Sequence, residues 1–295
     1  MSIIRRSLKS VLKKLPFKRE VFTLLKAIAI PPGRMYRHLY FNGVFPVKTG
    51  VTTSFDIMHY GFRIENELFW EGIEHGWECV SLGLWIKLCK NASVIVDIGA
   101  NTGVYALIAK SVNPRSKVYA YEPVDRVFEK LVKNNELNKY DIQCSPLAIS
   151  NKNGEAVIYD NATSDHIYSV TVNQNFFPPT TQVIEKRIQT ITLDTIIEQE
   201  HIQRFDLLKI DVETHEPEVL EGYAKHLKIH RPTMLIEILT DEIGQKIETM
   251  LEGLGYLYFN IDETKGIRRV EKIEKSDYYN YLFCSEETAL MLGIR

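Results

Sequence analysis

The stretch "VIVDIGANTG", residues 94–103, decides the fold. Four apolar residues surround Asp97, and Gly99 and Gly103 then flank Ala-Asn-Thr. A short β-branched run that leads into a glycine-containing loop is typical of a buried strand that turns into a helix. In an open α/β sheet, ligands bind beyond the carboxyl ends of the strands. The stretch therefore predicts a ligand-binding loop with a carboxylate beside it.

The chain after this loop repeats the pattern of strand and helix, which predicts a doubly wound parallel α/β sheet. The last two predicted strands have no helical pattern between them, so we expect an antiparallel closing hairpin. Helices are expected at 102–112, 126–138 and 217–227, and Pro217 suits a first helical turn. Strands are expected at 93–97, 117–123, 142–150, 205–213, 232–239, 256–262 and 278–285.

The sequence divides into three parts on these patterns. We expect a basic amphipathic arm at 1–34, an accessory or substrate-cap segment at 35–90, and a Rossmann-like domain at 91–295. Within the domain, "GEAVIYD" indicates a strand, "RIQTITLDTI" looks extended, and the polar, proline-broken segment between them predicts a lid at about 155–190. Three tryptophans, Trp70, Trp77 and Trp85, could stack on a sugar, but core packing is the favoured interpretation.

Charge and cysteine usage narrow the classes of protein. Residues 1–40 hold ten Lys or Arg against one acid, while the whole chain has a net charge of −2. The body is therefore acidic, which argues against a nucleic-acid partner. The four cysteines form no Cys-x-x-Cys pair, which favours a reducing, cytoplasmic location over a zinc site or disulfide framework.

The N-terminal stretch has an apolar stripe opposite a basic face. Ile4, Leu8 and Leu15 share one helical side, whereas Arg5 and Lys9 lie on the other. This pattern predicts a helix lying on an anionic membrane, at the inner face of the cell membrane, or else a helix packed on protein or a disordered arm. No apolar run reaches the ~20 residues of a spanning helix.

Two cofactor classes use a glycine loop of this kind. Dinucleotides require Gly-x-Gly-x-x-Gly, whereas here Asn101 stands where the second glycine belongs, which weakens a nicotinamide interpretation. S-adenosylmethionine carries an ammonium group and two ribose hydroxyls. Asp97 could serve the ammonium side, and Glu122, at the end of the second strand, could accept both hydroxyls. The alternative for Asp97 is a helix or turn cap.

Five stretches together resemble the FkbM family of S-adenosylmethionine-dependent methyltransferases, over about residues 91–285. They are "VDIGANTGVYALIAK", "YAYEPVDRVFEKLVKNNELN", "TLDTI", "DLLKIDVETHEPEVLEG" and "PTMLIEI". The resemblance implies the class I methyltransferase fold and O-methylation of sugars or other hydroxyl compounds. In the family a glycine usually follows the second acid of the fourth stretch, where this chain has Thr214.

The resemblance and the strand-end chemistry together predict the cofactor contacts. We expect S-adenosylmethionine to contact Asp97, Gly99, Ala100, Asn101, Thr102, Gly103, Glu122, Pro123 and Ala148.

The acceptor chemistry is expected in "KIDVETHE". A hydroxyl is a poor nucleophile while protonated, so methyl transfer to it benefits from a general base or a metal ion. In an extended segment Asp211, Glu213 and His215 would share one face, and in a helix Asp211 and His215 would still be neighbours. Either Asp211 or His215 is the expected base, with Glu213 and Glu237 orienting the acceptor or Lys209.

Several alternatives stay open at this point. The same carboxylates and histidine could hold a divalent cation, which we do not favour. Lys209, Glu213 and Glu237 could instead form a buried structural ion network. His166 and Tyr168 of the predicted lid are weaker site candidates. A small-molecule or glycan acceptor is the expected partner of an enzyme, and a catalytically silent cofactor-binding protein of the same fold is the alternative.

Overall fold

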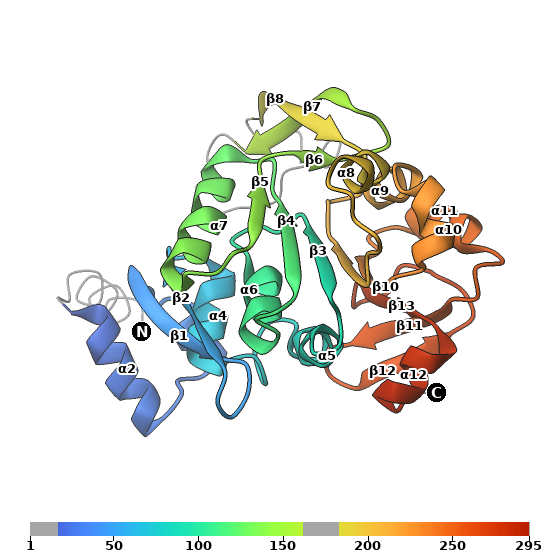
Figure 1. Cartoon of the computed structure of the whole chain (residues 1–295). Helices are drawn as coiled ribbons and strands as arrows, with labels where there is room; N and C mark the ends of the chain where they lie inside the picture. The colour runs from blue at the N-terminus through green and yellow to red at the C-terminus, as the bar shows by residue number, and fades with distance from the viewer. Residues whose placement is uncertain (1–16, 162–182, 295) are drawn as a thin grey trace. The chain divides into compact units, whose positions relative to one another are not determined.

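The computed structural model describes residues 17–161 and 183–294 (Figure 1). It contains two compact units, residues 1–79 and 80–295, and each is described here by itself. The boundary between them falls inside the predicted accessory segment 35–90. Residues 1–16 of the predicted arm lie outside the described residues. So do residues 162–182 of the predicted lid, with His166 and Tyr168.

Unit 1 is a small helix and hairpin assembly around aromatic side chains. Its elements are α2 (Lys18–Ile28), α3 (Gly33–Tyr36), β1 (Gly43–Lys48), β2 (Ser54–His59) and α4 (Arg63–Glu71). β1 and β2 pair antiparallel, in agreement with the extended pattern of the sequence. The Phe22 and Trp70 rings lie 5.7 Å apart, and Tyr36 stacks on Trp70. Trp70 is fully buried, so it packs in the core.

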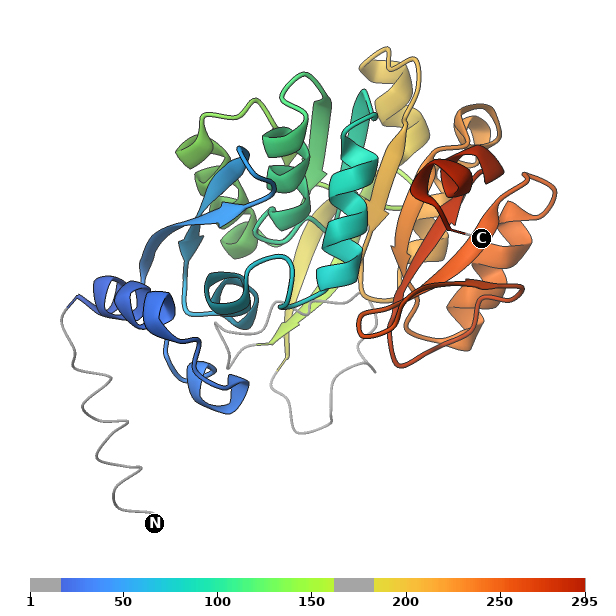
Figure 2. The same ribbon diagram turned by 90° about the horizontal axis from the view of Figure 1, so that it is seen from below.

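Unit 2 is built on an eight-stranded sheet, which confirms the doubly wound α/β prediction (Figures 1 and 2). The strand order is β12-β11-β13-β10-β9-β3-β4-β5, and β13 is antiparallel to β10. β11 pairs antiparallel with β13, as expected for the closing strands. The strands are β3 (Val94–Ile98), β4 (Lys117–Tyr121), β5 (Gln143–Ser145), β9 (Leu207–Ile210), β10 (Thr233–Glu237), β11 (Leu257–Asp262), β12 (Gly266–Val270) and β13 (Asn280–Cys284).

The closing hairpin differs from the prediction in one respect. β11 and β13 are not consecutive, because β12 lies between them in the chain and pairs with the other edge of β11. Arg268 and Arg269 of β12 are exposed. A short edge strand with charged side chains has a weak sequence signal, and such strands also resist pairing with other chains.

The helices of unit 2 include the three that the sequence predicts. They are α5 (Cys79–Cys89), α6 (Val104–Val112), α7 (Asp125–Asn138), α8 (Leu193–Gln199), α9 (Glu216–Glu221), α10 (Ala224–His230), α11 (Asp241–Leu251) and α12 (Glu286–Leu292). The helix expected at 217–227 is in fact two, α9 and α10. A side chain at Gly222, between them, would meet the Ser150 carbonyl oxygen at 2.0 Å. Close packing therefore interrupts the helix there.

Alternation along the strands gives each face of the sheet its own residues. Val96, Leu208 and Met234 belong to one hydrophobic core with residues of α8, α9, α10 and α11. Because successive side chains of a strand point to opposite faces, Asp97 and Lys209 point to the other face. Trp85 of α5 is fully buried, and its indole N–H donates to the Tyr105 carbonyl, so it also serves packing.

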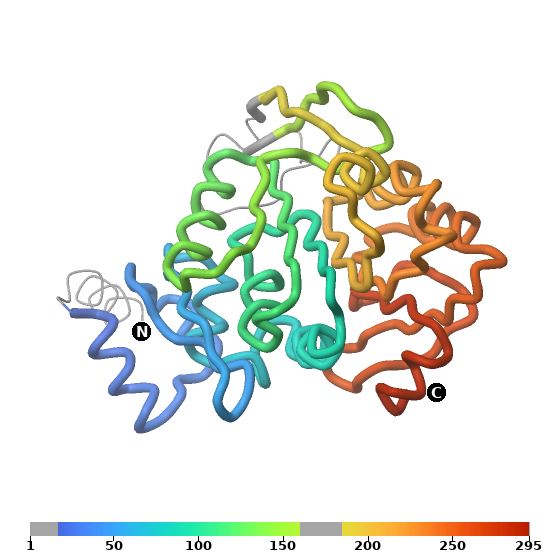
Figure 3. Tube along the Cα trace, viewed as in Figure 1, coloured from blue at the N-terminus to red at the C-terminus, as the bar shows by residue number. Residues whose placement is uncertain are grey.

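A second, three-stranded sheet flanks the insertion. β6 (Ala148–Ile149) pairs parallel with β8 (Val183–Ile191), and β8 pairs antiparallel with β7 (Gly154–Asn161). Figure 3 follows this part of the trace at the top of the view. The predicted third strand therefore splits between two sheets, as β5 and β6. The stretch expected to be extended at 187–196 ends in helix α8, because the Thr192 side chain accepts a hydrogen bond from the Thr195 amide and caps it.

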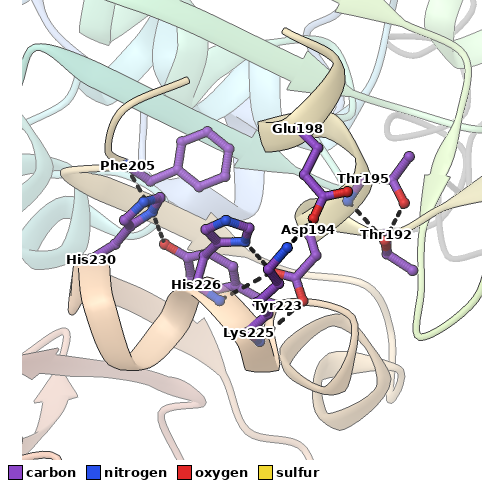
Figure 4. A network of polar contacts seen from close by, with 9 residues as sticks. All are labelled: Thr192, Asp194, Thr195, Glu198, Phe205, Tyr223, Lys225, His226 and His230. Carbon is purple, nitrogen blue, oxygen red and sulfur yellow. Dashed lines mark hydrogen bonds and ion pairs between the residues drawn. The ribbon is translucent and has the colours of Figure 1, made fainter. Parts of the chain in front are cut away.

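A polar network joins α8 to α10 (Figure 4). His226 Nδ1 lies 2.7 Å from Asp194 Oδ1, and the Tyr223 hydroxyl lies 2.9 Å from His230 Nδ1. The Phe205 amide also donates to His230 Nδ1. Burial lowers the pKa of His230, in keeping with a neutral ring that accepts these bonds. The network fixes the helices near the start of β9, at the opposite end from Asp211.

No helix in the described ranges 17–161 and 183–294 is long and apolar enough to cross a membrane.

Candidate active site

Strand register brings a buried lysine beside the strand-end carboxylate. Asp97 of β3 and Lys209 of β9 are directly opposed in the parallel pair, and each side chain is only 1% exposed. Neighbouring strands lie roughly 4.8 Å apart and the two side chains leave the same face. The positive charge of Lys209 therefore lies close enough to Asp97 to favour the ionised carboxylate.

Lys209 is surrounded by polar and aromatic groups. Its Nζ lies 3.1 Å from Asp211 Oδ2 and 3.4 Å from Asn280 Oδ1. It also lies 5.2 Å from the centre of the Tyr105 ring. A buried ammonium group is stable only when it is paired and hydrogen-bonded. The predicted pairing of Lys209 with a carboxylate is thus present, and Asn280 is a partner that the sequence did not reveal.

Glu237 completes this group at the end of β10. Its backbone is paired with that of Asn280 across the antiparallel β10–β13 ladder. Burial raises the pKa of Glu237 strongly, and the nearby Asp211 raises it further, while Lys209 opposes the shift. These effects favour the protonated form of this side chain, which can donate a hydrogen bond.

The two glycines of the loop have a structural reason within the protein. Gly99 has φ +78°, and a Cβ there would lie 1.8 Å from the Asp211 carbonyl oxygen. Gly103 has φ +93°, and a Cβ there would lie 2.6 Å from Leu131 Cδ1. The turn after β9 and helix α7 therefore pack closely on both glycines. Their contact with a cofactor stays a prediction.

Asp97 has a structural contact that favours the capping alternative. Its Oδ2 accepts a hydrogen bond of 3.0 Å from the Ala106 amide, in the first turn of α6. Burial raises the pKa of Asp97 to about 7, against the effects of Lys209 and of the Ala106 amide. The carboxylate therefore lies inside the sheet-to-helix turn and not at its surface. Its contact with the cofactor stays a prediction.

Glu122 holds the glycine loop to the end of β4. Its Oε2 accepts from the Asn101 amide at 3.0 Å, and its Oε1 accepts from the Val124 amide at 3.0 Å. Burial raises the pKa of Glu122 to about 7. Each carboxylate oxygen has about two lone pairs, so both oxygens keep capacity for two further donors, such as a pair of ribose hydroxyls.

The rest of the loop is tightly held. The amides of Gly99 and Ala100 both donate to the Tyr121 carbonyl, and Asn101 adopts φ 52°. The carbonyl of Thr102 accepts from the Asn134 side chain at 2.8 Å. In the part of the chain that the structure describes, the buried Thr102 hydroxyl oxygen has no hydrogen-bond partner.

Two further residues predicted for the cofactor lie close to this edge in different ways. Pro123 is half-buried between Glu122 and Val124. Ala148 begins β6, and it packs against a small cluster that includes Val124 and Ile158. Ala148 is therefore part of the packing between α7 and the inserted sheet, and its role toward a cofactor stays a prediction.

The segment after β9 is a strained turn and neither of the two conformations considered from the sequence. Glu213 has φ 52° and Thr214 has φ 82°. A positive φ at a β-branched residue is rare and costs about 1–3 kcal/mol. Thr214 stands where the family has glycine, so the sequence departure coincides with a backbone conformation that favours glycine.

Glu216, which the sequence analysis missed, holds this turn. It is fully buried, and its Oε1 accepts from the amides of Val212 at 3.1 Å and Thr214 at 3.3 Å. Burial raises its pKa to about 8, and the charge of Asp211 raises it further. Its Oε2 has no hydrogen-bond partner among residues 17–161 and 183–294. Acidic residues are common in the first turn of a helix, so the sequence does not single out Glu216. Its role becomes visible only with the strained turn that it holds.

His215 contacts two residues other than Asp211, and its predicted place beside Asp211 stays a prediction. Its Nε2 lies 3.0 Å from the Ser150 hydroxyl, and its Nδ1 lies 3.5 Å from Glu218 Oε2. Burial lowers the pKa of His215, although Glu218 and Glu221 act in the opposite direction. The two ring nitrogens thus have partners after β6 and in α9.

The described residues contain no group of three or more His, Cys, Asp or Glu side chains arranged to hold a metal ion.

The edge formed by β3, β4 and β9 fits S-adenosylmethionine chemically. Glu122 presents acceptors suited to hydroxyl groups, and the unpartnered Thr102 hydroxyl can donate or accept one bond. Asp97 and Asp211 are acidic residues at this edge, which suits a cationic ligand. Among the described residues, the amides from Gly99 to Gly103 each donate within the protein, so the loop suits a cation better than the pyrophosphate of a dinucleotide.

Comparison with known proteins agrees with these features. Residues 97–258, more than half of the chain, match the methyltransferase FkbM domain family. Methyltransferase 1 of Beauveria bassiana is 28% identical over 180 residues, which cover 56% of this chain and 72% of that protein. The 31-O-demethyl-FK506 methyltransferase FkbM of Streptomyces tacrolimicus is 27% identical over 190 residues, or 55% of this chain and 72% of that protein.

Two other similar proteins were found. The hexuronic acid methyltransferase AglP of Haloferax volcanii is 24% identical over 148 residues, which cover 49% of this chain and 56% of that protein. Among solved structures, a methyltransferase FkbM from Methylobacillus flagellatus is 16% identical. That match covers 65% of this chain and 43% of the other, at a TM-score of 0.43, which is too weak a likeness to bear on function.

Proposed function

The chain belongs to the methyltransferase FkbM family and is an S-adenosylmethionine-dependent methyltransferase, and we propose that it methylates a hydroxyl group of a sugar or a similar polar molecule. The observation that carries this proposal is the pair formed by buried Lys209 and partly exposed Asp211 at the end of β9, 3.1 Å apart. The pair provides a fixed carboxylate beside the cofactor loop. A hydroxyl acceptor requires such a base, because it must lose a proton.

The activities named for two relatives favour an oxygen acceptor. One is a hexuronic acid methyltransferase, and the other acts on a 31-O-demethyl compound. Both matches cover about half of this chain, and the archaeal one covers 56% of its own protein. A sugar acid presents hydroxyls and a carboxylate, and the family relationship therefore supports a polar acceptor without fixing which one.

In the proposed mechanism, Asp211 accepts the proton of the acceptor hydroxyl while the oxygen forms its new bond to carbon. S-adenosylmethionine, when bound, supplies an electrophilic methyl group on a sulfonium, and S-adenosylhomocysteine remains. Lys209 holds Asp211 in one orientation. Protonated Glu237 donates a hydrogen bond that orients the acceptor. His215 is not the base in this mechanism, since Ser150 and Glu218 occupy its two nitrogens.

On the cofactor side, Glu122 would bind the ribose hydroxyls and Asp97 would act on the cationic end through its negative charge. Much of the acceleration comes from holding the acceptor in line with the methyl group, because well-oriented reactants gain about 7–11 kcal/mol. We infer no metal step.

The test uses S-adenosylmethionine with a labelled methyl group and a panel of acceptors: hexuronic acids, neutral sugars, small alcohols and, for comparison, amines. The expected result is label transfer to a hydroxyl of a sugar or sugar acid, with S-adenosylhomocysteine released in equal amount. Asp211→Asn should lower turnover at least a hundred-fold. Label found only on nitrogen acceptors, or on none of the hydroxyl compounds while other acceptors react, would contradict the proposal.

A further inference from the structure

Helix α2 of unit 1 presents an apolar stripe to solvent. Phe17, at its start, is 76% exposed, Leu24 is 68% exposed and Ile28 is 84% exposed. Val21 and Leu25 are also exposed. Residues spaced by three and four positions share one side of a helix, so these five side chains form a continuous stripe. Proteins rarely leave such apolar area to water unless it contacts a membrane or a partner.

The orientation of this stripe is fixed by the opposite side of α2. Phe22 is buried, and its ring lies 5.7 Å from the Trp70 ring. Lys26 donates to the Phe69 carbonyl and lies over the Phe69 ring, 5.2 Å from its centre. One side of α2 is therefore anchored to the core of unit 1, and the apolar stripe faces outward as a consequence.

Basic residues and further apolar residues accompany the stripe. Ile30 and Met35, which follow α2, are 46% and 56% exposed. Arg34 and Arg37 are exposed near them. Residues 1–40 carry ten Lys or Arg and one acid. Apolar side chains beside a strong excess of basic charge match an anionic lipid surface, which offers acyl chains and negative headgroups together.

We propose that the exposed face of α2, formed by Phe17, Val21, Leu24, Leu25 and Ile28 with Arg34 and Arg37 beside it, is a docking surface for an anionic lipid bilayer. The eleven residues of α2 are about 16 Å long. This is too short to cross the ~30 Å hydrocarbon core, so the helix lies in the headgroup region. Binding is reversible and weakens with salt.

Charge favours a bilayer over a second copy of the chain. Two copies that met through this face would bring two strongly basic segments together, and like charges at an interface oppose association. The negative headgroups of an anionic bilayer would instead neutralise these basic charges, so no such repulsion arises. This proposal does not depend on the identity of the methyl acceptor, because it concerns unit 1 alone.

The experiment measures binding of the full chain to vesicles. Vesicles of phosphatidylcholine alone are compared with vesicles that also contain phosphatidylglycerol, by co-sedimentation at two salt concentrations. The double variant Leu24→Glu/Ile28→Glu should bind the anionic vesicles at least ten-fold more weakly. Ile229→Glu changes an equally exposed apolar residue on α10, 71% exposed, and should bind as the wild type does.

A second variant keeps the apolar stripe and tests the charges. Arg34→Glu/Arg37→Glu should also weaken binding to anionic vesicles, and raising the salt should reduce this difference. Circular dichroism of each variant establishes that it is folded, and S-adenosylmethionine binding should be the same in all of them.

Three outcomes would overturn the proposal. Unchanged vesicle binding by the Leu24→Glu/Ile28→Glu variant would show that residues 1–16 suffice. Equal binding to neutral and anionic vesicles would show that charge does not contribute to the binding. A wild-type dimer in light scattering that becomes a monomer in the variant, without vesicle binding, would make the face an interface between copies. Loss of methyl transfer with a soluble acceptor would bear on the proposed function and not on docking.

Discussion

Two turns follow the adjacent parallel strands β3 and β9, and both contain residues with a left-handed backbone conformation. The two turns differ in the residue types that adopt it. The turn after β3 uses glycine at two of its left-handed positions, Gly99 and Gly103, whereas the turn after β9 uses Glu213 and Thr214. The first conformation costs little, because glycine adopts it freely. The second is strained and is held by the buried carboxyl of Glu216.

The difference suggests a division of roles. A Cβ at Gly99 would lie 1.8 Å from the Asp211 carbonyl oxygen, so backbone packing fixes the glycine turn, which we expect to contact the cofactor. The β9 turn is fixed by a side chain, and we expect Asp211 and Glu213 to act on the acceptor. Strain is often stored where chemistry occurs. We therefore expect changes in the first turn to affect the fold and cofactor binding, and changes in the second to affect turnover.

The largest effect is expected from Gly99→Ala. The new Cβ would lie 1.8 Å from the Asp211 carbonyl oxygen, so β3 and β9 would have to separate. We expect a loss of more than about 4 kcal/mol in the free energy of unfolding, beyond the usual range for a single substitution. Urea denaturation measures it.

Gly253→Ala is the matched control for this variant. Gly253 has φ +74°, close to that of Gly99, but no atom lies within 4 Å of its Cβ position. Gly253→Ala should lower the free energy of unfolding by only about 1–2 kcal/mol, which is the cost of a left-handed backbone for a residue with a Cβ. Similar losses in both variants would mean that contact with β9 does not explain Gly99.

The next effect is that of Glu216→Leu. The substitution removes the acceptor for the Val212 and Thr214 amides and should cost about 2 kcal/mol in stability. Because Asp211 precedes these residues, a shift of about 1 Å in the turn should also lower kcat by roughly a hundred-fold. Exposed Glu221 lies on the same helix, and Glu221→Leu should change stability by no more than about 0.5 kcal/mol. An unchanged kcat in Glu216→Leu would show that the conformation of this turn does not affect catalysis.

The pH dependence of stability tests the protonation state of the same residue. The pKa of Glu216 is raised to about 8 by burial, whereas an unfolded glutamate titrates near about 4.3. A raised pKa means that the stabilisation is complete below about pH 4 and is lost as the pH rises through about 8.

Glutamine has the same shape and no charge, so Glu216→Gln is the appropriate comparison. Between pH 5 and pH 8 the wild type should lose stability more steeply than this variant, by at most about 1.4 kcal/mol per pH unit. Parallel curves in urea denaturation at several pH values would show that Glu216 is ionised in the folded protein.

The smallest expected effect is a gain. Thr214→Gly relieves the positive φ of 82° and should raise the free energy of unfolding by about 1 kcal/mol, or leave it unchanged where unfolded-state entropy offsets the relief. It should also restore part of the kcat lost in Glu216→Leu. Thr249→Gly, on the exposed side of α11, should instead lose a few tenths of a kcal/mol. A loss at position 214 larger than at position 249 would contradict the strained turn.

Much of the fold could be predicted from the sequence because buried strands and amphipathic helices follow periodicity. β3, β4, β9 and β10 were predicted on apolar runs, and α6 and α7 on the helical pattern. β12 was not predicted, because its two charged arginines weaken the sequence signal of an edge strand. α11 and α12 were not identified, although Thr240 and Ser285 cap them and would have been a usable signal.

The candidate site was predicted in part. Strand-end position and the resemblance to the FkbM family together predicted Asp97, Glu122, Lys209, Asp211 and Glu237, because parallel strands bring their ends to one edge, and the roles of these residues stay predictions. Glu216 holds a turn that contains two left-handed residues, and sequence periodicity does not predict such a turn. One indication of this turn is present in the sequence: Thr214 stands where the family usually has a glycine. Asn280 comes from the closing strands, far along the chain.

One measurement tests the division of roles most directly: calorimetric titration of S-adenosylmethionine into the wild type, Glu122→Ala and Asp211→Asn, which requires no knowledge of the acceptor. The account predicts that Glu122→Ala weakens the Kd at least ten-fold, because the ribose hydroxyls lose their acceptor, while Asp211→Asn stays within about three-fold of the wild type. If Asp211→Asn lost the cofactor and Glu122→Ala kept it, the assignment of the two strand ends would be wrong.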